Sequence, residues 1–227
     1  MKKSIITLII FAFALSSCGI FRKTETHPDP RTHDEGEGVV INGVRWATRN
    51  VDMPGTFAET PESVGMFFQW NNKRAWSAVD ERVEGWRGIE ARGTAWYAEN
   101  DPCPAGWRVP THEELQSLVD AENEWVTQNG VYGRLFGTAP YQVFLPVTAW
   151  RRGRGMLGGI NAGGFYWSST MSNPLIETLA FETLAFRTAY FLQVLNEYNE
   201  CGYIGYWVSS TNRANGFAIR CVSINKK

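Results

Sequence analysis

A β-hairpin is predicted by the stretch Val39-Val40-Ile41-Asn42-Gly43-Val44-Arg45-Trp46, in which two apolar runs flank the pair Asn42-Gly43. Asparagine and glycine both tolerate a positive φ, and this pair is a strong signal for a two-residue hairpin turn. Further short apolar or alternating runs follow along the chain. They lie at residues 66–70, 142–150, 165–168, 189–194, 206–209 and 217–224. The globular part of the chain is therefore expected to consist largely of short strands.

One helix is predicted to begin at Thr111. Its hydroxyl can cap the free backbone amides of the first turn, and Glu114 stands three residues later, as in a capping box. Leu115, Leu118 and Val119 continue at the spacing that places apolar side chains on one face of a helix.

The composition is that of a folded, water-soluble domain: the chain has 227 residues, of which 44% are hydrophobic and 20% are charged. The formal net charge is −1, so the chain has no broad basic field, and nucleic acid is not an expected partner. Large aromatic side chains are frequent, with 13 Phe, 8 Tyr and 10 Trp against 3 His. So few histidines argue against a multi-histidine metal site, and we expect neither a metal nor a cofactor.

The N-terminus has the pattern of a secretory signal, because Met1-Lys2-Lys3 is positively charged and an apolar run over residues 5–15 follows. This run is shorter than the roughly 20 residues that a membrane-spanning helix needs. The next residues, Leu15-Ser16-Ser17-Cys18, resemble the lipobox of bacterial lipoproteins. The resemblance implies cleavage before Cys18 and lipid on its sulfur and its new amino group, so that several acyl chains would hold the protein on a membrane. The alternative is an ordinary signal peptide with an incidental cysteine.

The sequence divides into three parts. Residues 1–17 form the predicted lipoprotein signal peptide, residues 18–38 a flexible tether, and residues 39–227 a single globular domain. The tether is rich in charged residues and poor in apolar ones, so it cannot bury enough surface to offset the entropy of ordering. We therefore expect a protein of the bacterial cell envelope, attached to the outer membrane. The sequence does not choose between the periplasmic face and the outer surface of that membrane.

Besides Cys18, the chain has three cysteines, which are Cys103, Cys201 and Cys221. The oxidising envelope permits disulfides, and three thiols allow one internal bridge and leave one cysteine over. The composition alone does not choose the pair.

Five segments of the domain, in this order, are similar to one family of bacterial envelope domains. They are Ile41-Asn42-Gly43-Val44-Arg45-Trp46-Ala47-Thr48-Arg49-Asn50-Val51-Asp52, Asp101-Pro102-Cys103-Pro104-Ala105-Gly106-Trp107-Arg108-Val109-Pro110-Thr111, Phe144-Leu145-Pro146, Gly164-Phe165-Tyr166-Trp167-Ser168-Ser169-Thr170 and Asn215-Gly216-Phe217-Ala218-Ile219-Arg220-Cys221-Val222. The chain thereby resembles the Fibrobacter succinogenes major paralogous domain family over about residues 39–223. That family has no generally assigned activity.

The stretch Trp107-Arg108-Val109-Pro110-Thr111, with Glu114, is also similar to a segment of formylglycine-generating enzymes and related C-type-lectin-like domains. These resemblances imply an α+β, C-type-lectin-like fold with short, mostly antiparallel strands, one or two helices and long irregular loops. Such a fold pairs strands near both termini and brings Cys103 close to Cys221. The resemblance therefore implies a disulfide between these two cysteines and leaves Cys201 unpaired.

Two patterns that suggest chemistry are better explained by structure. Residues 153–158 match the spacing G-x-G-x-x-G of dinucleotide sites, but a glycine-rich loop and a strand follow instead of the helix that would receive the pyrophosphate. His112, Glu113 and Glu114 fall in the first turn of the predicted helix, where carboxylates offset the helix dipole. Neither pattern predicts a catalytic site.

The remaining signal is a set of aromatic and arginine residues on predicted loops and strand ends. The candidate ligand-binding residues are Trp150, Arg151, Arg152, Arg154, Trp207 and Arg213. Flat rings present a large contact area at low entropic cost, and arginine binds acidic sugars or phosphates through paired hydrogen bonds. The opposite interpretation is that such rings fill the core beneath the loops, as we expect for Trp46, Trp107 and Trp167.

These observations favour a non-enzymatic recognition module, anchored to the membrane by lipid, whose loop face binds a glycan or a protein of the envelope. Two alternatives are a divergent, carboxylate-dependent polysaccharide hydrolase and a structural subunit of a fimbrial or envelope assembly. Two acidic side chains about 5–9 Å apart in a pocket would favour the hydrolase. An exposed apolar patch larger than a few hundred Å² would favour the subunit.

Overall fold

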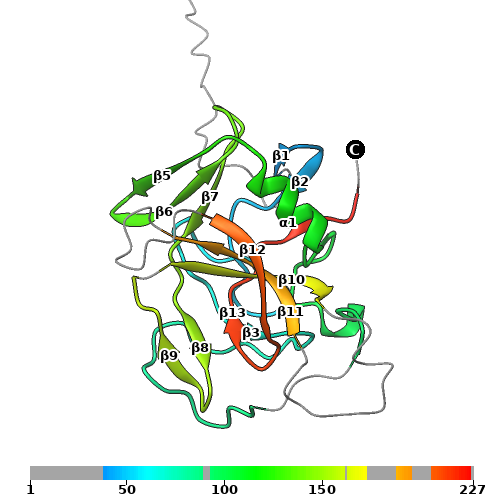
Figure 1. The fold of residues 1–227 in the computed structure, drawn as a ribbon, viewed down its shortest axis with the longest axis vertical. Helices are drawn as coiled ribbons and strands as arrows, with labels where there is room; N and C mark the ends of the chain where they lie inside the picture. The colour runs from blue at the N-terminus through cyan, green and yellow to red at the C-terminus, as the bar shows by residue number, and fades with distance from the viewer. Residues whose placement is uncertain (1–37, 89–92, 162, 173–187, 196–205, 226–227) are drawn as a thin grey trace, which may run out of the picture.

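The computed structural model describes residues 38–88, 93–161, 163–172, 188–195 and 206–225. Of the residues described, 41% lie in strands and 7% are helical, and Figure 1 shows several small sheets with the short helix α1 to one side. The prediction of an α+β, C-type-lectin-like fold is therefore wrong, and the domain is mostly β. The physical reason is that the described segments between the strands fold as hairpins and loops, not as a second α-helix.

The first sheet joins the two ends of the domain. Its strands are, in order, β1 (Val39–Ile41), β2 (Val44–Trp46), β14 (Val222–Ser223) and β4 (Trp107–Arg108). β1 and β2 form the predicted hairpin, in which Asn42 and Gly43 adopt φ values of 48° and 79°. Val222 pairs with both Trp46 and Arg108. The expected pairing of strands from near both termini is confirmed.

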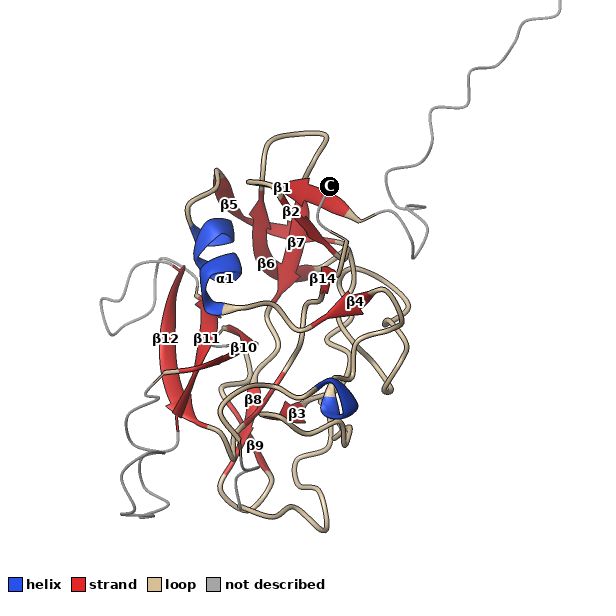
Figure 2. Ribbon diagram, turned by 90° about the vertical axis from the view of Figure 1, so that its right-hand side faces the viewer, coloured by secondary structure: helices blue, strands red, loops and turns tan. Residues whose placement is uncertain are grey.

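The longest strands form a second antiparallel sheet, and the helix packs against it. The strand order is β10 (Gly164–Met171), β11 (Thr188–Val194) and β12 (Tyr206–Asn212), with α1 (His112–Val119) beside them in Figure 2. The hydroxyl of Thr111 accepts a hydrogen bond from the Glu114 N–H, and the Glu114 carboxylate accepts one from the Thr111 N–H. The predicted capping box is confirmed, and Leu115 and Leu118 are buried beneath the helix.

Two further antiparallel sheets lie toward opposite ends of the molecule in Figures 1 and 2. One has the order β5 (Asn123–Gln128), β6 (Val131–Phe136) and β7 (Val143–Pro146). The other has the order β3 (Phe68–Gln69), β13 (Gly216–Phe217), β8 (Trp150–Arg152) and β9 (Met156–Gly158). A short 3-10 helix, η1 (Ala98–Asn100), precedes β4.

Buried aromatic rings hold the sheets together. Trp46 and Trp167 are 0% exposed and Trp107 is 8% exposed, so their prediction as core residues is confirmed. The ring of Trp167 stacks on Phe217 with 4.4 Å between centroids, and its indole N–H donates to the Phe68 carbonyl at 2.8 Å. Because β10 carries Trp167 and β13 carries Phe217, these contacts tie two different sheets into one core.

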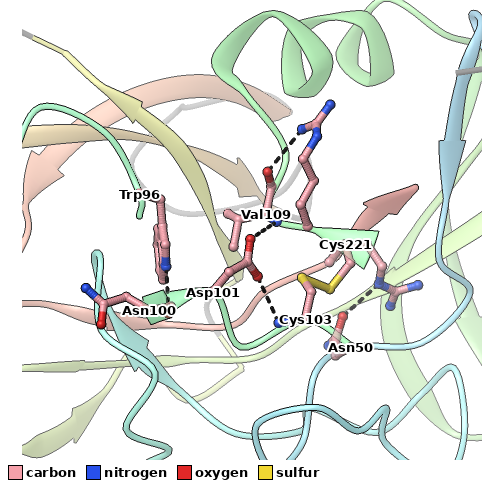
Figure 3. The surroundings of a disulfide bond; sticks show 9 residues. Asn50, Trp96, Asn100, Asp101, Cys103, Val109 and Cys221 are labelled. Atoms are coloured by element: carbon pink, nitrogen blue, oxygen red, sulfur yellow. Dashed lines mark hydrogen bonds between the residues drawn. A yellow bond between two sulfur atoms is a disulfide. The ribbon is translucent and has the colours of Figure 1, made fainter. Parts of the chain in front are cut away.

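A disulfide joins Cys103 to Cys221, the pair that the family resemblance implied. Figure 3 shows Asp101 beside it, where the carboxylate accepts hydrogen bonds from the backbone N–H groups of Cys103 at 2.9 Å and Val109 at 3.0 Å. Burial raises the pKa of the Asp101 carboxyl, and the two backbone hydrogen bonds oppose that shift. Cys201, and the lipobox with Cys18, lie outside the described residues.

Two of the predicted strands are divided in the structure. The run over 142–150 becomes β7 and the first residue of β8, with Ala149 between them at a φ of 60°. The run over 217–224 becomes the end of β13 and β14, with Arg220 between them. Arg220 is fully buried and donates to the carbonyl oxygens of Ala47 and Phe144. Burial lowers the pKa of its guanidinium to about 10, so the group still carries its charge at neutral pH.

Candidate functional site

A pocket of about 800 Å³ opens at the end of the molecule where β8 and β9 lie in Figure 1. It is lined by Arg82, Val83, Glu84, Gly85, Trp86, Gly88, Gly153 and Arg154, and we call it the arginine pocket. Its size falls within the range of about 300–1,000 Å³ that is usual for small-molecule sites. Two arginines, one carboxylate and one indole therefore share a cavity large enough for a ligand.

Backbone pairing joins the two walls of this pocket. Arg82 forms an isolated antiparallel bridge with Met156 of β9. The N–H of Val83 donates to the carbonyl of Gly155 at 3.3 Å. The segment that carries Arg82 therefore runs beside the β8–β9 hairpin, whose turn carries Arg154.

The buried side chain of Arg151 connects the two wall segments through hydrogen bonds. It is 0% exposed, and its Nε and Nη1 donate to the carbonyl oxygens of Ser77 at 2.6 Å and Gly155 at 2.7 Å, while Nη2 donates to that of Asp80. A guanidinium presents five N–H donors in a fixed fork, so one side chain satisfies three carbonyls from two segments. Arg151, predicted as a ligand contact, instead supports the pocket.

Trp86 forms the aromatic wall. Its half-buried ring packs against Trp76, with 5.0 Å between centroids and 54° between planes. Gly216 of β13 lies against the ring, because a Cβ at that position would come within 2.7 Å of the Trp86 Cη2. The absence of a side chain at Gly216 lets the indole rest directly on the sheet, and Trp86, which is half-buried, lines the pocket.

The side chains of Arg82 and Arg154 are exposed, and in the part of the chain that the structure describes neither forms a hydrogen bond or an ion pair. Arg108 shows the opposite case, because both of its terminal nitrogens donate to the Glu114 carboxylate, at 2.8 and 2.6 Å. That hydrogen-bonded carboxylate raises the pKa of Arg108. The guanidinium groups of the arginine pocket thus keep their donors available, beside the acceptor oxygens of Glu84.

The predicted ligand-binding residues are not all brought together. Arg154 lines the pocket, and Arg152 is exposed on β8. Trp150 is half-buried, with its ring edge-on to Phe165 at 4.4 Å between centroids, so it packs toward the core. Trp207 is half-buried on β12, in a different sheet, and outside the lining of the pocket.

Arg213 is a second buried support. It is 0% exposed, its Nη1 donates to the Gly93 carbonyl at 2.7 Å, and its guanidinium lies 4.6 Å from the ring centroid of Trp70. Full burial leaves Arg151 and Arg213 no surface with which to contact a ligand. The structure assigns both to the support of loops, and we leave them out of the candidate site.

Arg82, Glu84 and Trp86 line the pocket but were not among the predicted ligand-binding residues. One signal was available, a series of tryptophans spaced by 6, 10 and 10 residues through a polar region: Trp70, Trp76, Trp86 and Trp96. Three of these are buried, and only Trp86 lines the pocket. Trp86 lies close to Gly155 and Gly216, and local sequence does not reveal such tertiary contacts.

A second pocket, of about 300 Å³, has a neutral lining among the residues described. It is formed by Val39, Thr48, Pro61, Gln128, Asn129, Leu135, Pro140, Gln142, Val143 and Phe144, and we call it the amide pocket. One carboxylate oxygen of Glu62 accepts hydrogen bonds from the side-chain amides of Gln128 at 2.7 Å and Asn129 at 2.8 Å. Partial burial by itself would raise the pKa of Glu62, but hydrogen bonds, led by that from Gln128, outweigh it and lower the pKa.

Comparison with known proteins identifies no relative: the chain matches no family model, no curated protein and no solved structure. Within the described residues, no helix combines the length and the apolar character needed to cross a membrane. The interpretation of the site therefore depends on its own chemistry.

Proposed function

We propose that the protein is a recognition module of a bacterial cell envelope, anchored by lipid, which binds a glycan in the arginine pocket and releases it unchanged. The observation that carries this proposal is the half-buried indole of Trp86, which forms one wall of a cavity of about 800 Å³. An indole presents a flat apolar face, and the apolar face of a sugar ring stacks against such a surface.

The polar groups of the pocket match the hydroxyl groups of a sugar. Arg82 and Arg154 supply N–H donors, and Glu84 supplies acceptor oxygens. Arg151 holds the walls in place before any ligand arrives, since it bonds to Gly155 on one side and to the segment 77–80 on the other. A preformed pocket reduces the entropy that binding must overcome.

The cellular setting is part of the proposal and is supported by the sequence. The lipobox-like stretch Leu15-Ser16-Ser17-Cys18 supports lipid attachment at Cys18 and a place on the outer membrane. Five motifs in a fixed order support membership in the Fibrobacter succinogenes major paralogous domain family. The motif residues Trp46 and Trp167 are fully buried, as core positions of a shared domain would be.

The binding proposal is tested with the full chain, purified in detergent and applied to an array of plant and bacterial glycans. We expect Trp86→Ala to weaken binding at least about tenfold, as the loss of a central aromatic contact does. Trp207→Ala is the matched control, a half-buried tryptophan outside the pocket. Each variant is checked by circular dichroism and thermal unfolding.

Three results would reject the binding proposal. They are the absence of any glycan bound by the wild-type chain, unchanged binding by a folded Trp86→Ala variant, and loss of binding in the Trp207→Ala variant instead. Chromatography of the bound glycan after prolonged incubation tests the claim that it is released unchanged, because shortened chains would show a hydrolase.

The anchor is tested by expressing the full chain in a Gram-negative bacterium fed an alkyne-bearing fatty acid. Wild-type protein is expected to carry the label and to sediment with the outer membrane, whereas Cys18→Ser is expected to do neither. An unlabelled wild-type protein would reject lipid attachment and would favour an ordinary signal peptide.

A further inference from the structure

We infer that the glycan bound by the arginine pocket is acidic, and that its carboxylate or sulfate groups are bound by the guanidinium groups of Arg82 and Arg154. This inference rests on the proposed function and names the class of ligand for the same pocket.

The first support is the placement of the two arginines. Arg82 lies on the segment that pairs with Met156, and Arg154 lies in the turn of the β8–β9 hairpin, so the two wall segments run side by side. The hydrogen bond from Val83 to Gly155 holds these segments together. Both side chains line one cavity from adjacent segments, so a single ligand in that cavity can meet both guanidinium groups.

The second support is that these guanidinium groups are free. Neither side chain has a hydrogen bond or an ion pair within the described part of the chain, and both are exposed. The arginines that stabilise this fold behave differently, since Arg151 and Arg220 are buried and donate to backbone carbonyls. Among the described residues, Arg82 and Arg154 therefore stabilise no other group through a hydrogen bond or an ion pair. A planar guanidinium matches the two oxygens of a carboxylate or sulfate.

The third support is the local charge. Among the described residues of segments 80–88 and 151–154, the positive side chains are Arg82, Arg87, Arg151, Arg152 and Arg154, and the negative ones are Asp80, Glu81 and Glu84. Five positive and three negative groups leave a balance of about +2, although the whole chain carries −1. The positive balance of these segments favours an anionic ligand at this end of the molecule.

The test compares acidic oligosaccharides with neutral forms of the same chains. Oligomers of galacturonate, glucuronate and guluronate are measured beside their carboxyl-reduced products, and sulfated galactan oligomers beside their desulfated products, by calorimetry with the full chain in detergent. At least one acidic form is expected to bind about tenfold or more tightly than its neutral product, with binding that weakens as salt is raised from 50 to 500 mM. The uronate and sulfate arms separate the two sources of charge.

The variants Arg82→Gln and Arg154→Gln each replace the charged guanidinium group of an exposed side chain by a neutral amide. Each is expected to weaken binding of the acidic form about tenfold and to leave any binding of the neutral form within about twofold. The control is Arg45→Gln, which replaces a half-buried arginine on β2 outside the pocket. It should change neither the binding of the acidic form nor that of the neutral form.

Three outcomes overturn the inference in different ways. Equal binding of acidic and neutral forms, sensitive to Trp86→Ala but not to Arg82→Gln or Arg154→Gln, would keep the proposed function and refute the acidic ligand. Binding of no member of the panel by a chain that still binds a neutral glycan on the array would also refute the acidic ligand alone. Absence of binding on both the panel and the array would refute the proposed function together with the inference.

Discussion

The arginine pocket and the amide pocket lie toward opposite ends of the molecule, and their walls are ordered in different ways. Strands β1, β5, β6 and β7 supply half of the residues that line the amide pocket, so the ladder of backbone hydrogen bonds positions that half of its lining. Most of the arginine pocket is loop, over residues 82–88 and 153–154, and Arg151 positions it by donating to three carbonyls. Where this chain lacks strands, a buried arginine supplies the donors that a neighbouring strand would otherwise offer.

The two pockets also differ in charge. The arginine pocket carries two free guanidinium groups and one carboxylate. The amide pocket has a neutral lining, and Glu62 beside it holds the side-chain amides of Gln128 and Asn129. We therefore expect an anionic ligand to distinguish the two ends of the molecule.

The largest effect is expected from the disulfide, which lies outside the lining of both pockets. The bond closes a loop of 118 residues, so replacing both Cys103 and Cys221 by alanine should lower the free energy of unfolding by about 4–5 kcal/mol. Urea unfolding measures this loss. Hydrogen exchange should show weaker protection around both pockets alike, and weakening confined to one of them would show that the cross-link serves only one region.

Arg151→Met should have the next largest effect and should separate the two regions. It leaves three carbonyl groups without their donor, at a cost of about 1 kcal/mol or more each, so we expect a loss of about 3 kcal/mol. Hydrogen exchange should rise around the arginine pocket and stay unchanged around the amide pocket. The control is Arg152→Met, which replaces an exposed arginine on the same strand. Its free energy of unfolding should stay within about 0.5 kcal/mol of the wild-type value. Equal losses for both variants would contradict the role of Arg151.

Two features of the fold that local sequence determines were predicted correctly. The hairpin at Asn42-Gly43 and the capping box at Thr111 depend on residues a few positions apart, and both are confirmed. The β5–β6 hairpin was not predicted, although its turn at Asn129-Gly130 carries the same signal and adopts φ values of 48° and 83°. The fold class was predicted wrongly because it came from a family resemblance carried by short motifs, which fix a helix start but not the segments between strands.

The site was predicted less well, because sequence does not distinguish a free arginine from a buried one. Arg151 and Arg154 stand in the same glycine-rich stretch, yet one is buried beneath the pocket and the other is exposed in it. The difference comes from the carbonyls of Ser77 and Asp80, more than 70 residues away along the chain. Arg82 and Trp86 were missed for the same reason, since their neighbours across the pocket are distant in sequence.

A smaller effect is expected from filling the space under Trp86. In Gly216→Ala the new Cβ would lie 2.7 Å from the Trp86 ring, so the indole must shift, at a cost of about 1–3 kcal/mol. Thermal unfolding and the fluorescence of the tryptophans measure the change, and glycan binding should weaken with it. Gly88→Ala, in the same pocket, meets its nearest neighbour at 3.8 Å and should alter neither stability nor fluorescence. Equal changes in thermal unfolding and fluorescence for both variants would contradict the conclusion that Trp86 packs directly on Gly216.

The smallest effect is expected at the amide pocket and depends on pH. The hydrogen bonds that Glu62 accepts outweigh its partial burial, so its pKa is lower in the folded protein than the ordinary value of 4.5. The carboxylate form therefore contributes stability above about pH 4.5, and this contribution is lost as the pH falls through the lowered pKa. Because the side chain is largely solvated, the contribution is less than about 1 kcal/mol.

Glu62→Gln removes the charge while keeping one acceptor oxygen for the amides of Gln128 and Asn129. The variant should be slightly less stable than wild type at pH 7 and equally stable at a pH below the pKa of Glu62, as followed by urea unfolding across that range. Glu59→Gln, an exposed carboxylate close by in the chain, is the control and should match wild type throughout. Neither substitution should alter glycan binding, because both lie outside the lining of the arginine pocket. A loss of glycan binding in Glu62→Gln would show that the two ends of the molecule are coupled. It would contradict the conclusion that the two pockets are ordered independently.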